Sequence, residues 1–202
     1  VTGQVLLREP PRPVQVHAYV DGNVVEVIPD EGVVIGTSGA FIQGIFGVGG
    51  EYWGPLHVLA DASDQALDAA QIDTECEGRI VVAGGLLTLD GIRRAQEVGA
   101  VGVIGGGIRD QDLRSLLGAD LGVTITGAEE IGLAAIVTEG FGEIAMAKRT
   151  FELLKDRTGR EASISGATQI RAGVMRPEII IPDIDVKEMT ATARSESGEG
   201  LS

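Results

Sequence analysis

The stretch Ala100-Val-Gly-Val-Ile-Gly-Gly-Gly-Ile-Arg-Asp110 decides the fold that the sequence predicts. An apolar run leads into three glycines and then a charged segment, which is typical of a strand, a glycine-rich turn and a helix. Backbone N–H groups at such a helix N-terminus can bind an anion, because glycine leaves the approach open. Similar glycine-rich turns follow the apolar runs in 80–85 and 135–142, so we expect three loops at one edge of a sheet.

Predicted strands and helices alternate on both sides of this stretch. Between strands at 79–83 and 101–104, an amphipathic helix is expected over 88–98, with Thr88 as its N-cap. Further helices are predicted over 110–117, closed by Gly118, and over 143–155, and further strands at 123–126, 134–137, 162–166 and 178–181. We therefore predict an α/β domain over 78–182, with a βαβ-type, mostly parallel sheet.

The first 60 residues are β-rich by their pattern. Apolar residues alternate through 14–20, 24–28 and 33–35, with turn sequences between these runs, and glycines at close intervals in 40–50 indicate sharp bends. We predict a small barrel-sandwich-like β-module over 1–60, a connector over 61–77 and a polar linker or tail over 183–202. The fold class is thus α/β with a β-rich N-terminal part.

The hairpin pattern in this module resembles a known one. Gly22-x-Val-x-x-Val with Pro29-x-x-Gly32-x-x-Ile35 is similar to the hairpin of lipoyl/biotinyl-type barrel-sandwich hybrid domains. In those carriers a lysine at a hairpin tip holds the cofactor, but no lysine precedes Lys148 here. A biotin or lipoate carrier is therefore excluded, no cofactor is expected, and the module is expected to serve as a docking surface.

A second resemblance spans most of the chain. It rests on Ile125-Thr-Gly-Ala-Glu-Glu, Val137-Thr-Glu-Gly-Phe-Gly142, Ser165-Gly-Ala-Thr-Gln-Ile-Arg-Ala-Gly173 and Arg176-Pro-Glu-Ile-Ile-Ile-Pro182, which resemble an uncharacterised prokaryotic family. That family carries a lipoyl/biotinyl-like module, an α/β domain and often a C-terminal KOW-type domain, for which no sequence remains after Pro182. The resemblance implies no known activity, although a KOW module points to work near RNA or the transcription and translation machinery.

Composition narrows the classes of partner. The net charge of −14 disfavours direct binding of nucleic acid or anionic lipid. No apolar run approaches the roughly 20 residues of a membrane helix, so we expect a cytoplasmic protein. Because the chain starts at Val1 rather than at Met, we expect it to be part of a longer protein.

The first candidate site is a crevice at the carboxyl ends of the parallel strands, where α/β sheets bind small molecules. Two arginines there would attract a small anionic metabolite. The predicted ligand-binding residues are Gly105, Gly106, Gly107, Arg109, Glu139, Gly140, Thr168, Gln169 and Arg171. Neither a GxGxxG nor a Walker motif is present, and the alternative is that the glycines only permit tight turns.

Other reactive residues carry weaker signals. Glu129, Glu130, Glu139 and Glu143 are candidates for acid/base or hard-cation chemistry, yet Glu129 and Glu143 equally suit helix N-termini. Glu75 and Glu77 would raise the pKa of Cys76, the only cysteine, which argues against a nucleophile. His17 and His57 are expected to be structural, and no catalytic residue or metal ligand is assigned.

Aromatic residues gather between positions 41 and 53. Phe46, Tyr52 and Trp53 are predicted to form an interaction surface, because aromatic side chains commonly anchor interfaces. The alternative is that they fill the core of the β-module. We expect a non-enzymatic binding or assembly protein with a protein partner or a second copy of itself. The alternative is an enzyme or sensor that binds a small anionic metabolite at the glycine-rich edge.

Overall fold

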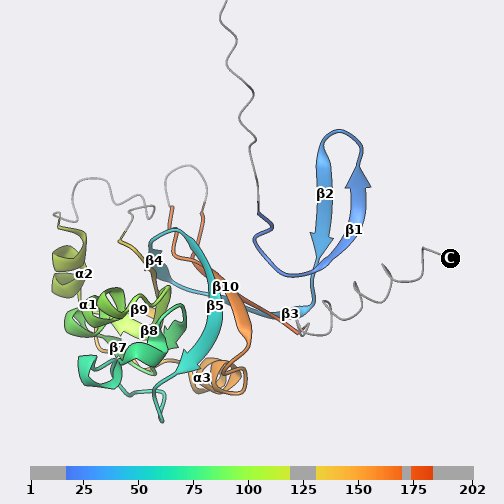
Figure 1. Cartoon of the computed structure of the whole chain (residues 1–202). Coiled ribbons are helices and arrows are strands. Elements are labelled where there is room, and N and C mark those ends of the chain that lie inside the picture. Colours follow the sequence, from blue (N-terminus) through green and yellow to red (C-terminus); the bar gives the residue numbers. More distant parts are fainter. Residues whose placement is uncertain (1–16, 119–130, 170–173, 184–202) are drawn as a thin grey trace, which may run out of the picture.

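The computed structural model describes residues 17–118, 131–169 and 174–183, which form a sheet-rich protein (Figure 1). Its three α-helices within these residues are α1 (Leu89–Val98), α2 (Asp110–Leu117) and α3 (Lys148–Lys155). The strands are β1 (Asn23–Ile28), β2 (Gly32–Gly36), β3 (Gly39–Gln43), β4 (Phe46–Val48), β5 (Glu51–Val58), β6 (Ile80–Val82), β7 (Leu86–Leu87), β8 (Gly102–Ile108), β9 (Ala134–Phe141), β10 (Glu161–Ser165) and β11 (Glu178–Pro182).

One continuous segment, residues 39–48, closes the main sheet. The strand order is β3-β11-β10-β5-β6-β8-β9-β4, so consecutive strands β3 and β4 lie at opposite ends of it. Between them, Gly44 N donates to Pro177 O at 2.8 Å and Ile45 N donates to Val137 O at 2.9 Å. The segment therefore passes from β11 to β9 without a break in its hydrogen bonding, and the sheet closes into a barrel.

The sheet is mixed rather than mostly parallel. Among the described strands, β5, β6, β8, β9 and the short β7 pair in parallel, whereas β3, β10, β11 and β4 make antiparallel pairs. The predicted boundary at residue 60 does not divide this sheet, because β3, β4 and β5 pair with strands from 134–182 and 80–82. Only the β1–β2 hairpin forms a separate, two-stranded sheet.

The inside of the barrel is filled by β-branched and small apolar side chains from the strands, with α3 packed against them. Ile164 of β10 and Leu56 of β5 are fully buried in this cluster, together with Phe151 and Leu154 of α3. The members from the strands are Ile42, Leu56, Ile80, Val82, Ile104, Ala134, Ile136, Ala162, Ile164, Ile179 and Ile181. A core of this composition suits the low aromatic content of the chain.

A second core lies between the outer face of the parallel strands and helices α1 and α2. Val81 and Val103 face Ile92 of α1 and Leu113 of α2 within one buried cluster. The predicted connector, residues 61–77, also packs here, through Leu67, Ile72 and Cys76. It forms two short 3-10 turns capped by Asp68 and Asp73.

The sequence predicted the bounds of α1 and α2 well, and the start of α3 wrongly. Thr88 caps α1 by accepting from Gly91 N at 3.1 Å, and α2 ends at Gly118 in the left-handed conformation, as predicted. Helix α3 starts at Lys148 rather than at Glu143, because Met146 N is bonded to the carbonyl oxygens of Ser63 and Gly84. Residues 143–147 are thus held against neighbouring loops instead of forming a helical turn.

The β1–β2 hairpin extends away from the barrel in Figure 1. It pairs antiparallel from Asn23↔Gly36 to Ile28↔Gly32, with a bulge between Val24 and Glu26. The remaining strands expected in a separate β-module over 1–60 belong to the barrel. The predicted strand at 14–20 is described only from residue 17, where it is not a strand, and residues 184–202 of the predicted tail lie outside the described part.

Truncating a side chain at the centre of the barrel should destabilise the protein strongly. Ile164→Ala removes a fully buried side chain from the inner cluster, and we expect a loss of about 2–5 kcal/mol in the free energy of unfolding. Urea denaturation measures this loss. Val27→Ala, at a hairpin position with 66% exposure, is the control and should change stability by less than about 0.5 kcal/mol. Equal effects of the two changes would contradict this description of the core.

Candidate functional site

The three glycines at 105–107 lie inside strand β8, not in a turn. Pairing with β7 and β9 on either side keeps them extended through Ile108, and all three are buried. A Cβ on Gly106 would overlap the carbonyl oxygen of Ile144, and one on Gly107 would overlap that of Gly142. The absence of side chains therefore lets the loop after β9 cross directly over β8.

The backbone groups at this edge are also occupied. Gly84 N and Gly85 N both donate to Gln65 O, at 3.0 and 2.7 Å, and Gly106 N donates to Gly85 O at 2.7 Å. These N–H groups point at the protein's own carbonyl oxygens and are not available to an anion. The glycines thus serve close packing of loops 62–65 and 142–146.

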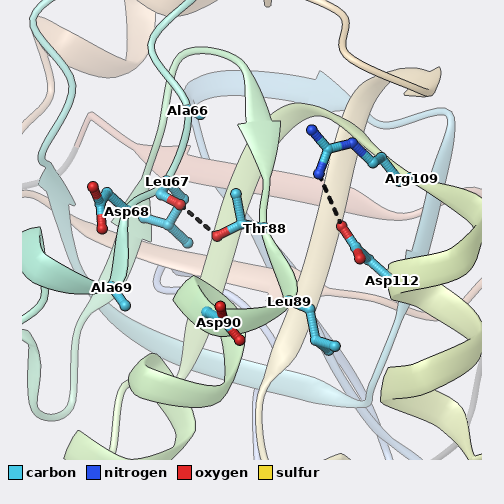
Figure 2. A pocket seen from close by; sticks show the side chains of 9 residues that line it. All are labelled: Ala66, Leu67, Asp68, Ala69, Thr88, Leu89, Asp90, Arg109 and Asp112. Carbon is cyan, nitrogen blue, oxygen red and sulfur yellow. Dashed lines mark hydrogen bonds and ion pairs between the residues drawn. The ribbon is translucent and has the colours of Figure 1, made fainter.

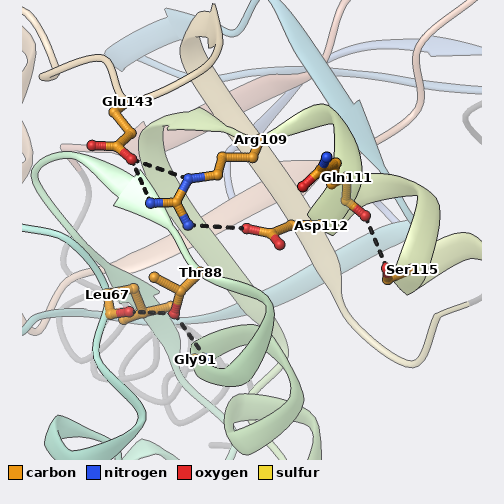
Figure 3. A network of polar contacts seen from close by, with 8 residues as sticks. All are labelled: Leu67, Thr88, Gly91, Arg109, Gln111, Asp112, Ser115 and Glu143. Atoms are coloured by element: carbon orange, nitrogen blue, oxygen red, sulfur yellow. Dashed lines mark hydrogen bonds and ion pairs between the residues drawn. The ribbon is translucent and has the colours of Figure 1, made fainter.

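Arg109, the residue after β8, is held between two carboxylates. Its guanidinium binds Glu143 through Nε (3.1 Å) and Nη2, and its Nη1 lies 3.8 Å from Asp112 (Figure 3). Hydrogen bonding to Glu143 raises the pKa of Arg109. Since its charge is matched by two acidic partners, Arg109 adds little attraction for a further anion.

A hollow of about 530 Å³ lies beside Arg109, between helix α1 and the loop after Ala66 (Figure 2). Its charged lining consists of Arg109 with Asp68, Asp90 and Asp112. At its floor, Thr88 Oγ1 donates to Leu67 O at 2.6 Å. The hollow is therefore net acidic, which disfavours the predicted anionic metabolite.

The structure separates the other predicted ligand-binding residues. Gly140 pairs with Gly107, but Glu139 accepts from Ala147 N at 3.0 Å, just before α3. Thr168 is buried on the other side of β9, where its hydroxyl bonds the N and O of Gly47, each at 2.9 Å. Gln169 makes a two-way backbone bridge with Met175. Arg171, Glu129 and Glu130 lie outside the described residues.

The three predicted interface aromatics have three different environments. Tyr52 faces the inside of the barrel and packs against its core. Phe46 is half-buried and packs on the exposed Phe141, with ring centroids 5.1 Å apart. Trp53, the neighbour of Tyr52 in β5, faces outward and is 46% exposed.

Trp53 belongs to a row of four residues across four strands of the barrel, in which the buried Ser163 is the one polar member. The register aligns Trp53 with Ser163, Ser163 with Ile180, and Ile180 with Phe41, which is 57% exposed. We call these four residues the outer row. Sequence reasoning included Phe41 only as one residue of the aromatic stretch and missed Ile180, because their place in one row depends on the pairing of β3 with β11, for which no local pattern exists.

The segment before β1 crosses this face at Trp53. The Trp53 indole Nε1 donates to Tyr19 O at 2.7 Å, and the two rings meet edge to face at 6.3 Å. Burial, and then the nearby carboxylates of Glu178 and Glu51, raise the pKa of the Tyr19 hydroxyl. Tyr19 therefore ties the β1–β2 hairpin to an acidic part of the barrel surface.

The remaining chemistry is sparse in the described residues. Burial raises the pKa of the Cys76 thiol, as expected for a structural cysteine. No group of three or more histidine, cysteine or acidic side chains in 17–118, 131–169 and 174–183 is placed to hold a metal ion. Among these residues, no helix has the length and apolar character needed to cross a membrane.

Comparison with protein-family models, curated proteins and solved structures found no match to this chain. Both resemblances noted in the sequence therefore stay predictions. The candidate site is accordingly judged on geometry alone, which favours the outer row over the glycine-rich edge.

Adding one methyl group at the glycine-rich edge should test its packing role. Gly106→Ala forces a Cβ into the Ile144 carbonyl, so we expect a loss of roughly 1–3 kcal/mol in unfolding free energy. Gly50→Ala is the matched control, since nothing lies within 4 Å of its Cβ position. If urea denaturation shows both variants to be as stable as the wild type, the edge is open rather than filled.

Ionisation of Glu161 should lower the stability of the folded protein as pH rises. Partial burial and the nearby Asp21 raise the pKa of Glu161, so the folded state binds this proton more tightly than the unfolded chain. Its favourable contribution is complete below the ordinary glutamate pKa of about 4.3 and disappears as pH rises through the raised value.

We therefore expect the stability of Glu161→Gln to rise relative to the wild type as the pH rises above the ordinary glutamate pKa of about 4.3. Urea midpoints read through Trp53 fluorescence measure the difference. Glu152→Gln, on the exposed side of α3, controls for the loss of one carboxylate. A wild-type minus variant difference that is constant with pH would count against this account.

Proposed function

We propose that this protein is a non-enzymatic binding or assembly protein that docks onto a protein partner through the outer row. The observation that carries the proposal is the exposure of Phe41 (57%) and Trp53 (46%) at the two ends of that row. Aromatic side chains on a rigid sheet provide large contact area with little loss of conformational entropy on binding.

The surroundings of the row support docking. The strands beneath it belong to a closed barrel, so the surface is preformed and needs no rearrangement to bind. The β1–β2 hairpin, which carries the lipoyl-like pattern without an attachment lysine, is fixed beside the row through Tyr19 and Trp53. We propose that hairpin and row act together as the docking surface.

A second candidate function is an enzyme or sensor for a small ligand at the hollow beside Arg109. The observation in its favour is the size of the hollow, about 530 Å³. The pairing of Arg109 with Glu143 and Asp112, and the acidic lining, count against an anionic ligand. The docking function is therefore the better supported of the two.

Removing both exposed aromatics should abolish docking and leave the fold intact. We compare wild type with Phe41→Ser plus Trp53→Ser by quantitative mass spectrometry of proteins retained from an extract of the source cells, and by light scattering of the purified chain. We expect binding of at least one protein, or self-association, to weaken roughly 30- to 1,000-fold in the double variant, since two buried aromatic anchors together contribute roughly 2–4 kcal/mol.

Val174→Ser plus Met175→Ser, at two other exposed apolar positions, is the control and should retain the partner. An identical set of retained proteins and an identical mass for all three chains would contradict the docking proposal. A rise in Tm with inorganic phosphate or a nucleotide that is lost in Arg109→Ala would instead support the second candidate.

A further inference from the structure

The β1–β2 hairpin pairs with no other strand among residues 17–118, 131–169 and 174–183. Within the described residues, β1 pairs only with β2 and β2 only with β1, whereas the barrel strands form a closed ring. The outward N–H and C=O groups of the two strands are therefore the edge at which an extended chain can add a further strand. A two-stranded hairpin alone is only marginally stable in water, so an added strand would also stabilise it.

One face of the hairpin is wholly apolar. The register pairs Val27 with Val33 and Val24 with Ile35, which places these four side chains on the same face. Val24, Val27 and Val33 are 57%, 66% and 52% exposed. The bulge puts Val25 and Glu26 together on the opposite face, with Val34. A strand that pairs with this hairpin thus meets apolar side chains at alternate positions.

The charges around these apolar side chains are all of one sign. Asp21 lies at the base of the hairpin, Glu26 in its middle, and Asp30 and Glu31 at its turn. No lysine or arginine occurs between Arg12 and Arg79 in the sequence, so no basic residue of the hairpin or of β3, β4 and β5 offsets them. The complementary partner is basic, because exposed like charges at an interface oppose binding.

We propose that the β1–β2 hairpin binds an extended segment of another protein, in which apolar residues alternate with lysine or arginine, by adding it as a third strand. This inference rests on the proposed docking function and names its partner class. A second copy of the hairpin is the less suitable occupant, since it would bring a second set of four carboxylates to the same edge.

The test uses the full 202-residue chain. A capped synthetic peptide, Lys-Val-Lys-Val-Lys-Val-Lys, is titrated into it and binding is measured by calorimetry at low and at moderate salt. We expect saturable one-to-one binding that weakens with salt, and slower hydrogen exchange of backbone amides in residues 23–36. Glu26→Gln plus Asp30→Asn should weaken binding about tenfold, and Glu97→Gln plus Glu152→Gln, which removes the same charge from α1 and α3, should not.

Two further peptides separate strand addition from general attraction to an acidic protein. The same sequence with N-methylated valines keeps the charge but loses hydrogen-bond donors, and it should bind at least about tenfold more weakly. The peptide with glutamate in place of lysine should not bind. Equal binding of the methylated peptide, or equal weakening by both pairs of substitutions, overturns the proposal, as does no binding at all.

Sedimentation of the chain without peptide tests whether a second copy of the chain occupies the hairpin edge. A monomer at tens of micromolar agrees with the proposal. A dimer that Val27→Asp dissociates shows that the occupant is a second copy and overturns it. The peptide could fail to bind while Phe41→Ser plus Trp53→Ser still weakens docking. That combination would overturn this inference and leave the proposed function supported.

Discussion

The hydrogen bonding of one segment, residues 39–48, to two different strands is the constraint on which the architecture depends. Without it, β9 and β11 would be the open edges of a mixed sheet, with unpaired backbone along both. With it, the inner apolar side chains are enclosed on every side and the outer row lies on a rigid surface. Closure also leaves the β1–β2 hairpin outside the ring, as a two-stranded sheet that pairs with no other described strand. The two surfaces proposed for docking therefore offer different groups to a partner. The outer row offers side chains, and the hairpin edge offers backbone N–H and C=O groups.

The sequence predicts those features of this structure that depend on residues close together in the chain, and it fails for features that depend on contacts between distant residues. Helices α1 and α2 were well predicted because short-range capping marks their ends in the sequence: Thr88 starts α1 and Gly118 ends α2. The glycines of β8 were misread as a turn because what they contact, the loop at 142–146, lies far along the chain. The division at residue 60 failed for the same reason, since no local pattern reveals that residues 39–48 pair with β9 and β11.

The candidate site illustrates the same limit at single residues. Tyr52 and Trp53 are neighbours in β5, so one must face inward and the other outward, but alternation alone does not say which. The answer comes from the pairing of β5 with β10, which aligns Trp53 with Ser163 on the outside. On that outer side Trp53 contacts Tyr19, through its indole N–H and through an edge-to-face ring contact. The clustering of aromatic residues in the sequence suggested an interaction surface. Which residues lie on that surface, however, depends on the register between strands.

Because the barrel closes through strands that are far apart in the sequence, the β1–β2 hairpin can form earlier during synthesis than the barrel. Residues 39–48 leave the ribosome long before residues 134–141 and 178–182, with which they pair. The ring is therefore incomplete until almost all of the described chain has been made, and such long-range pairings fold slowly. The β1–β2 hairpin, by contrast, joins strands separated by only a few residues and can form within microseconds of its synthesis. The residues of the acidic, apolar hairpin are thus synthesised well before the barrel can close, so the partner strand proposed above would find its binding edge while the protein is still being translated.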